Sequence, residues 1–110
     1  MTPIKKVVLV ATATAQAPIV ANRLIGFDGQ QAKAGAAVYG VTPRDADEGD
    51  SVAVECIGIV LVEAGGAIEV GKKVASDGNG CAVAGDANAF GYAVSATAEA
   101  GELVTVLMKG

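Results

Sequence analysis

Short runs of valine and isoleucine, separated by glycine and proline, make up much of the chain. Runs rich in β-branched residues and bounded by turn formers favour strands over helices. The longest run is 51–62, in which apolar and polar residues alternate up to Cys56 before the pattern becomes apolar throughout. This change predicts a β-bulge near Gly58, and the second half of the strand is expected to be buried on both faces.

The strongest turn signal lies between the apolar segments 74–76 and 81–83. Aspartate, asparagine and glycine all tolerate a left-handed backbone, so four such residues in a row predict a hairpin turn. The four turn residues are Asp77, Gly78, Asn79 and Gly80.

Shorter segments complete the predicted fold. Residues 90–98 and 103–108 indicate a second, longer hairpin. Residues 36–41 indicate a short strand that ends before Pro43, and residues 18–27 fit either a strand or a turn of helix. Several short strands with frequent turns are typical of small sandwiches and barrels. We therefore expect an all-β protein, a small β-sandwich or β-barrel with an extended N-terminal arm.

The beginning of the chain allows two interpretations. The first is an extended N-terminal arm, residues 1–17, followed by a single β domain, residues 18–110, because 4–10 is apolar and 12–16 alternates alanine with threonine. The second is a cleaved secretory leader, because Lys5-Lys6, an apolar run and a small-residue site occur in the order of a signal peptide. The second interpretation makes the chain a secreted or periplasmic β-domain binding module.

The composition argues against catalysis. The 110 residues contain no histidine, the side chain used most often for proton transfer near neutral pH and the commonest metal ligand. No serine or cysteine can therefore have a histidine to activate it. We expect no catalytic residue, no metal site and no cofactor. Hydrophobic residues make up 52% of the chain but aromatic residues only 4%, so the core must be built from small aliphatic side chains.

The charge distribution argues against nucleic acid as a partner. The formal net charge is −4, and lysine and arginine form no cluster larger than the pairs Lys5-Lys6 and Lys72-Lys73. No stretch approaches the roughly 20 apolar residues that a membrane-spanning helix needs, so no membrane partner is expected. The acidic run is polar and rich in turn-forming residues, so it is interpreted as a solvated loop. It also lacks the ligand count and closing glutamate of a calcium site. Its members are Asp45, Asp47, Glu48 and Asp50.

Two further motifs are given structural interpretations. Residues 66–73 follow the phosphate-loop pattern up to the last position, where Lys73 replaces the hydroxyl that would bind Mg²⁺, and Glu69 would add negative charge to the cradle. This loop is therefore not expected to bind a nucleotide. Cys56 and Cys81 lie in apolar stretches and are expected to be small buried side chains, not a disulfide.

The order and spacing of several segments resemble phage capsid cement proteins. These segments are 34–41, 66–71, 74–80, 90–94 and 98–107. Residues 24–29 followed by 35–38 also look like the head decoration proteins of lambda-type phages. Proteins of this kind sometimes carry a recombinase-like label, which the incomplete phosphate loop does not support.

The resemblance implies a structural virion protein without enzymatic activity. Such a protein, made in the host cytoplasm, binds the outer surface of an expanded icosahedral capsid and cements neighbouring major capsid subunits. The partner is then the major capsid protein. The resemblance also implies a homo-oligomer, with a trimer favoured and a dimer as the alternative.

An arm of 17 residues could reach an adjacent capsid subunit, because an extended chain spans roughly 3.3 Å per residue. There it could add a strand to an exposed sheet edge. We expect the arm to be exposed in the free protein and ordered on the capsid. The expected capsid-contact residues are Thr2, Pro3, Ile4, Lys5, Lys6, Val7, Val8, Leu9 and Val10.

Overall fold

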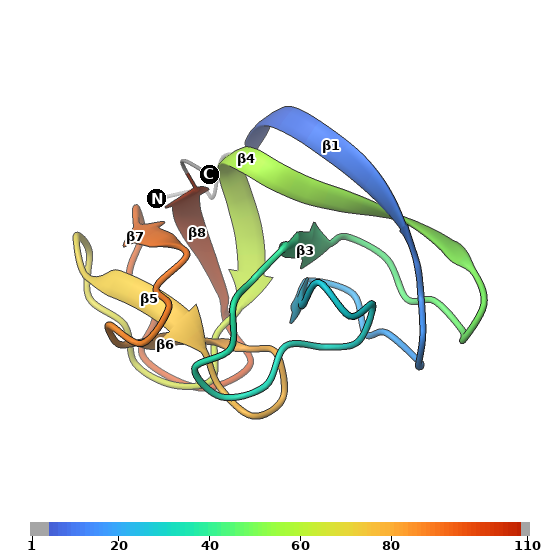
Figure 1. Cartoon of the computed structure of the whole chain (residues 1–110). Helices are drawn as coiled ribbons and strands as arrows, with labels where there is room; N and C mark the ends of the chain where they lie inside the picture. The colour runs from blue at the N-terminus through green and yellow to red at the C-terminus, as the bar shows by residue number, and fades with distance from the viewer. Residues whose placement is uncertain (1–4, 109–110) are drawn as a thin grey trace.

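The 13-residue strand β4 (Ser51–Glu63) organises the fold, because three other strands pair with it. The computed structural model describes residues 5–108, which form eight strands connected by turns and loops (Figure 1). The other strands are β1 (Lys6–Thr14), β2 (Arg23–Ile25), β3 (Gly40–Thr42), β5 (Lys73–Ser76), β6 (Ala82–Ala84), β7 (Gly91–Ala93) and β8 (Leu103–Met108). All pair in antiparallel fashion, which confirms the prediction of an all-β fold.

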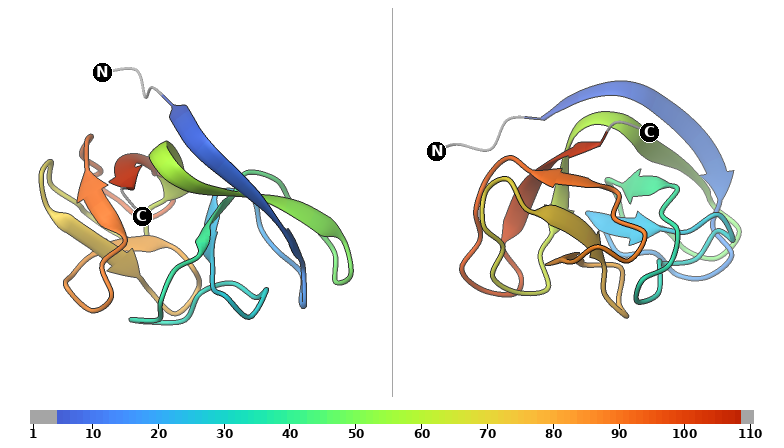
Figure 2. Two further views of the ribbon diagram at one scale, coloured as in Figure 1. Left: turned by 45° about the horizontal axis from the view of Figure 1, so that its top comes forward. Right: turned by 60° about the vertical axis from the view of Figure 1, so that its left-hand side comes forward.

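The strands close into a nearly complete barrel in the order β2-β3-β4-β8-β7-β5-β6. The two ends of this order meet where the N–H of Leu24 donates to the carbonyl of Gly80 at 2.7 Å. The N–H of Gly65 also donates to the carbonyl of Ala82 at 2.8 Å, which joins the end of β4 to β6. Strand β1 lies outside this order and runs along β4 on the outside of the barrel (Figure 2).

The interior is built from small aliphatic side chains, as the composition predicts. One cluster fills the barrel, and its larger side chains come from β2, β3, β4, β5 and β8 and from Ile68, between β4 and β5. They include Leu24, Val60, Val62, Val74, Val104 and Val106. A second cluster lies under the paired ends of β1 and β4 and includes Ala15, Ile19, Ile25, Val52 and Val54. Closely spaced valines fill a narrow barrel without aromatic rings.

The bulge predicted near Gly58 is confirmed. Gly58 has a φ of 121°, and Val7 and Leu9 pair with the adjacent residues Gly58 and Ile57, which leaves Val8 as an extra residue in β1. The prediction that the rest of the strand is buried on both faces is wrong. Val60 and other alternate residues face the barrel interior, whereas the outward-facing residues between them are only half-buried, because alternate residues of a barrel strand face outward.

The predicted turn at 77–80 is also confirmed. The N–H of Asp77 donates to the carbonyl of Cys81, and Oδ1 of Asp77 accepts hydrogen bonds from the N–H groups of Asn79 and Cys81. Of the four turn residues only Gly80 has a positive φ, at 76°, so a left-handed backbone is needed there and not at Gly78.

Several strands are shorter than the sequence pattern indicates. Residues 18–27 supply only β2, with Asn22 at a φ of 63° before it, and 36–41 contribute only the start of β3. The predicted strand 90–98 is reduced to β7. It ends because the N–H groups of Val94 and Ser95 both donate to the carbonyl of Thr105, so the ladder with β8 stops.

The predicted N-terminal arm is extended, but its described part lies on this chain's own sheet. Residues 6–14 pair with β4 from Ile59 down to Ser51. Thr2, Pro3 and Ile4 lie outside the described residues. Within residues 5–108, the structure contains no helix with the length and apolar character needed to cross a membrane.

Candidate functional site

An open, mostly apolar groove of about 820 Å³ crosses one face of the barrel. One wall comes from β1 and another from the loop that joins β2 to β3, and the groove continues over the loop before β7. Its main apolar side chains are Leu9, Phe27, Tyr39, Phe90, Tyr92 and Met108. No convergent set of charged groups lines it, so its shape and chemistry suit a macromolecular contact better than a reaction.

All four aromatic residues of the chain lie in this groove. The sequence has two phenylalanines, two tyrosines and no tryptophan, and Phe27, Tyr39, Phe90 and Tyr92 all line it. The rings of Phe27 and Tyr39 stack with their centroids 5.0 Å apart. Phe27 is nevertheless 72% exposed. Aromatic side chains in pockets often supply most of the binding energy of an interface, so this is the candidate contact surface.

Strand β1 adds exposed apolar side chains beside the groove. Val8 is 75% exposed and Val10 is 54% exposed, with the partly exposed Leu9 between them. Leu9 lines the groove whereas Val8 and Val10 do not, so β1 displays apolar groups both in the groove and beside it. No side chain of β1 is fully buried. Val7 and Ala13 pack partly buried against the two core clusters, and most of the other side chains of β1 are exposed.

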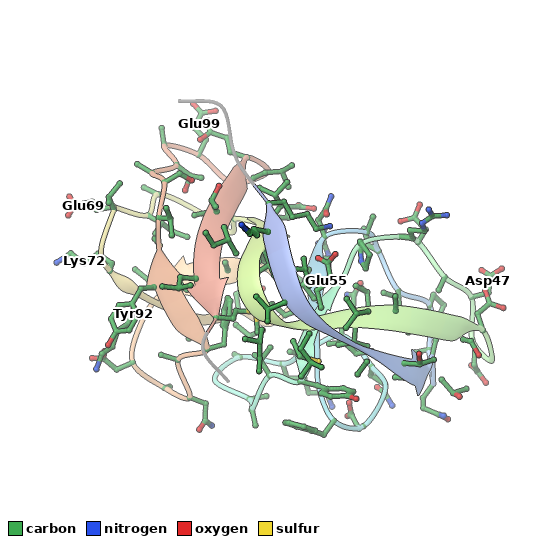
Figure 3. All side chains as sticks on the ribbon, turned by 90° about the horizontal axis from the view of Figure 1, so that it is seen from above. Asp47, Glu55, Glu69, Lys72, Tyr92 and Glu99 are labelled. Carbon is green, nitrogen blue, oxygen red and sulfur yellow. The ribbon has the colours of Figure 1, made fainter. Side chains whose placement is uncertain are left out.

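An ion pair fastens the beginning of β1. The Nζ of Lys5 lies 2.6 Å from Oε2 of Glu55. Glu55, which is labelled in Figure 3, is only 7% exposed. The other carboxylate oxygen of Glu55 is buried and has no hydrogen-bond partner among residues 5–108. Lys5 is therefore the only ion-pair partner of this buried carboxylate in the described chain.

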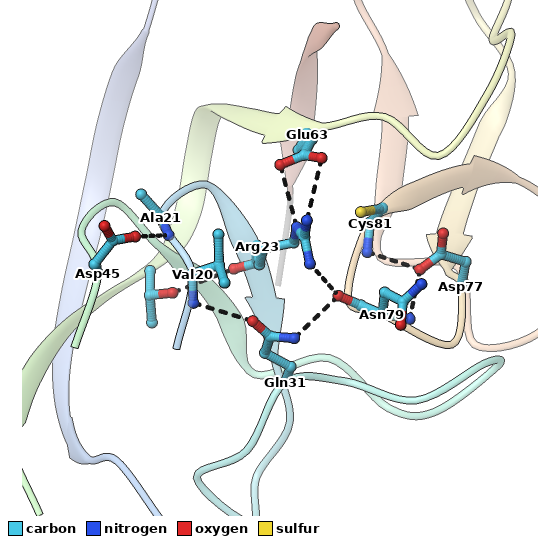
Figure 4. A network of polar contacts seen from close by, with 10 residues as sticks. Val20, Ala21, Arg23, Gln31, Asp45, Glu63, Asp77, Asn79 and Cys81 are labelled. Carbon is cyan, nitrogen blue, oxygen red and sulfur yellow. Dashed lines mark hydrogen bonds and ion pairs between the residues drawn. The ribbon is translucent and has the colours of Figure 1, made fainter. Parts of the chain in front are cut away.

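A polar network at the end of β4 lies where the barrel closes (Figure 4). The guanidinium of Arg23 donates to both carboxylate oxygens of Glu63 at 3.2 Å, and to the carbonyl of Asn79. The Nε2 of Gln31 donates to the same carbonyl. These hydrogen bonds to Glu63 raise the pKa of Arg23 despite its partial burial. The network joins β2, β4 and the 77–80 turn, so its role is structural.

The structure gives the other sequence motifs structural roles. Residues 66–73 connect β4 to β5, where Ile68 and Thr97 exchange backbone hydrogen bonds, while Glu69 and Lys72 extend outward (Figure 3). Cys56 and Cys81 are both free, as predicted; Cys81 is buried and Cys56 is half-buried at the groove. Residues 5–108 contain no group of three or more carboxylate, cysteine or histidine side chains placed to hold a metal.

The expected contact residues are only partly in the groove. Leu9 lines it, Val8 and Val10 lie on β1 next to it, and Lys5 is paired with Glu55. The sequence interpretation missed the aromatic residues of the groove, although their scarcity was visible. Four aromatic residues in a chain whose buried core is aliphatic are a signal of a surface role, because none of the four is fully buried. Phe90 and Tyr39 also pack from the outside against the two core clusters.

Comparisons with known proteins agree with this arrangement. Residues 3–110 match the family of phage cement proteins. The N base of the head fiber gp8.5 of bacteriophage phi29, solved by crystallography, is 30% identical with a TM-score of 0.74, covering 92% of this chain and 93% of that chain. No curated protein matches. The chain therefore belongs to the phage cement protein family, as a structural component of a phage head and not an enzyme.

Proposed function

We propose that this protein binds the outer surface of an expanded icosahedral phage capsid and cements neighbouring major capsid subunits. The observation that carries the proposal is the gathering of all four aromatic side chains in one open groove. The contact face consists of this groove and the exposed apolar residues of β1. An apolar surface of this kind is costly to leave in water and is typical of a protein interaction site.

Binding to the assembled shell is sufficient to stabilise it. A protein that binds only the expanded, assembled state shifts the equilibrium toward that state by mass action. Packaged DNA presses the shell outward. Each bound copy of this protein that spans a junction between capsid subunits therefore adds an interface that must break before the shell opens. The outer surface is the proposed location, because the chain carries a net charge of −4 and has no need to hold DNA there.

The residues of β1 extend the proposed contact. Val8, Leu9 and Val10 supply apolar area, and the preceding residues 2–6 remain predicted capsid contacts. The leader interpretation would remove β1, whereas the fold uses β1 as a strand and the family match begins at residue 3. The homo-oligomer, with a trimer favoured, remains part of the proposal.

The test uses heads of the phage assembled without this protein. Purified protein is mixed with these heads, and its binding is measured by co-sedimentation. Phe27→Ser should weaken binding about 30-fold, because an aromatic anchor contributes about 2 kcal/mol. Val70→Ser is the matched control, since Val70 is also exposed and lies outside the groove. Bound protein should also raise the temperature at which heads release DNA.

Two results would overturn the proposal. The wild-type protein could fail to sediment with heads at micromolar concentration. Alternatively, Phe27→Ser and Val70→Ser could bind equally well, in which case the groove is not the contact surface.

A further inference from the structure

The outer edge of β1 is the longest unpaired strand edge in the described chain. Within residues 5–108, β1 pairs only with β4, and its other side carries no neighbouring strand (Figure 2). The strands at the two ends of the barrel order, β2 and β6, are three residues long and are joined through Leu24 and Gly80. An edge of nine residues presents a row of backbone donors and acceptors to any strand that fits.

This edge has few of the devices that proteins use to prevent pairing. Soluble proteins place lysines or prolines along exposed edges, or cover them. In β1 the only charged residue is Lys6 at its start, and the strand contains no proline. The side chains of Val8 and Val10 are exposed instead. The bulge at Val8 twists this end of β1 but leaves Val10–Thr14 in a regular ladder with β4. A strand edge of this composition is therefore available for pairing with another strand.

The charges around β1 are complementary to those of a second β1. Lys6 marks one end and forms no ion pair within the described residues. At the other end lies the loop that contains the acidic run 45–50, called the acidic loop below. It contacts Ala15: the N–H of Ala15 donates to the carbonyl of Asp50, and the N–H of Gly49 donates to the carbonyl of Ala15. Figure 3 shows Asp47 at this end of the molecule. The strand is therefore basic at its start and acidic beyond its finish.

We propose that two copies of this chain join by antiparallel pairing of their β1 strands about a two-fold axis near Val10. In this register Lys6 faces Thr14 of the second copy and lies beside its acidic loop, and the contact occurs twice by symmetry. Val10 faces Val10 of the second copy. The two barrels then share one continuous sheet across the axis.

Symmetry favours this partner within a homo-oligomer. A two-fold contact needs only one self-complementary surface, whereas a three-fold ring made by strand pairing needs a second, different free edge. The described chain offers no second free edge of comparable length. A trimer must therefore use other surfaces, and it can still be paired with another trimer through β1. This inference goes beyond capsid binding and is tested without heads.

The first test is the mass of the protein in solution, measured by sedimentation equilibrium up to about 1 mM. The wild-type protein should form dimers, or hexamers if it is also a trimer. Val10→Lys should halve that mass or weaken the association at least tenfold, because the two lysines would face each other across the axis. Val70→Lys, an equal change at another exposed valine, should have no effect. Circular dichroism of each variant checks that the barrel is folded.

The second test is a charge exchange. Lys6→Glu should weaken the association severalfold, because it places glutamate beside the acidic loop of the second copy. Adding Glu48→Lys to the same chain should restore it, since each interface again has opposite charges.

Three results would overturn the proposal: a wild-type protein that stays monomeric or trimeric throughout this range, an association that Val10→Lys does not change, or a double variant that associates no better than Lys6→Glu alone. A monomer or trimer that gains hydrogen-exchange protection in residues 6–14 only on heads would show that a capsid strand takes this edge instead.

Discussion

The ammonium of Lys5 and the buried carboxylate of Glu55, 2.6 Å apart, tie the beginning of β1 to the middle of β4. Because the second oxygen of Glu55 has no partner among the described residues, the ion pair is the main compensation for burying this charge. β1 contributes no buried side chain of its own. Its attachment therefore depends on backbone pairing with β4, on this ionic contact and on the partly buried Val7 and Ala13, which pack against the two core clusters.

Lys5→Met should destabilise the fold, since it leaves the Glu55 carboxylate buried without an opposite charge. The expected loss in the free energy of unfolding is roughly 1–3 kcal/mol, less than for a fully buried pair because the lysine side chain is 35% exposed. Adding Glu55→Leu to Lys5→Met should recover most of the loss, because no charge is then buried. Urea unfolding of the two variants measures both effects, and a loss below about 0.5 kcal/mol in Lys5→Met would contradict this account.

Gly80→Val should destabilise the fold and Gly78→Val should not, although the two glycines lie two residues apart. Gly80 has a φ of 76°, and a Cβ there would lie 2.9 Å from the carbonyl oxygen of Leu24, which is where the barrel closes. Its replacement should lower the free energy of unfolding by about 2 kcal/mol. Gly78 has open space around it, so its replacement should change stability by less than about 0.5 kcal/mol. Equal melting temperatures would show that the turn is not needed to close the barrel.

The two cysteines should report on the groove by their alkylation rates. Burial raises the pKa of the Cys81 thiol, and the Asp77 carboxylate raises it further, so little reactive thiolate forms at Cys81. Cys56 is half-buried and lines the groove. In the free protein iodoacetamide should therefore modify Cys56 well before Cys81. On heads, the modification of Cys56 should slow at least tenfold, whereas the rate at Cys81 should not change. Mass spectrometry of the digested protein measures each site, and unchanged Cys56 reactivity on heads would place the capsid contact elsewhere.

The features predicted correctly are those fixed by local sequence. The irregular pairing at Gly58, opposite the extra residue Val8, and the turn at 77–80 both depend on residues that tolerate a left-handed or irregular backbone. That tolerance is a property of a few neighbouring positions and can be read from the sequence. The reduction of 90–98 to three residues could not be predicted in the same way. It depends on Thr105, whose carbonyl accepts two hydrogen bonds and ends the ladder.

The site was not predictable because it is assembled from distant segments. Phe27 and Tyr39 come from the loop between β2 and β3, whereas Phe90 directly precedes β7 and Tyr92 lies in it, and only the closure of the barrel brings them to one groove. The pairing of β1 with β4 is equally non-local. An alternating, exposed strand has no core-facing pattern to fix its partner, so the sequence pattern indicates only that residues 4–10 are extended.

Gly58→Ala should separate β1 from the rest of the barrel. At a φ of 121° any side chain is strained, and the Cβ would meet the carbonyl oxygen of Lys6 and lie 2.8 Å from the nitrogen of Val8. Gly101→Ala is the matched control, because Gly101 also has a positive φ but has no atom within 4 Å of its Cβ. Both variants carry the backbone strain of about 1–3 kcal/mol, and only Gly58→Ala adds the collision with β1. Hydrogen exchange should therefore quicken across residues 6–14 in Gly58→Ala alone, with the amides of β8 still protected. If the two variants exchange alike, the close approach at Gly58 does not hold β1 in place, and the proposed pairing of two β1 strands loses the rigid edge on which it depends.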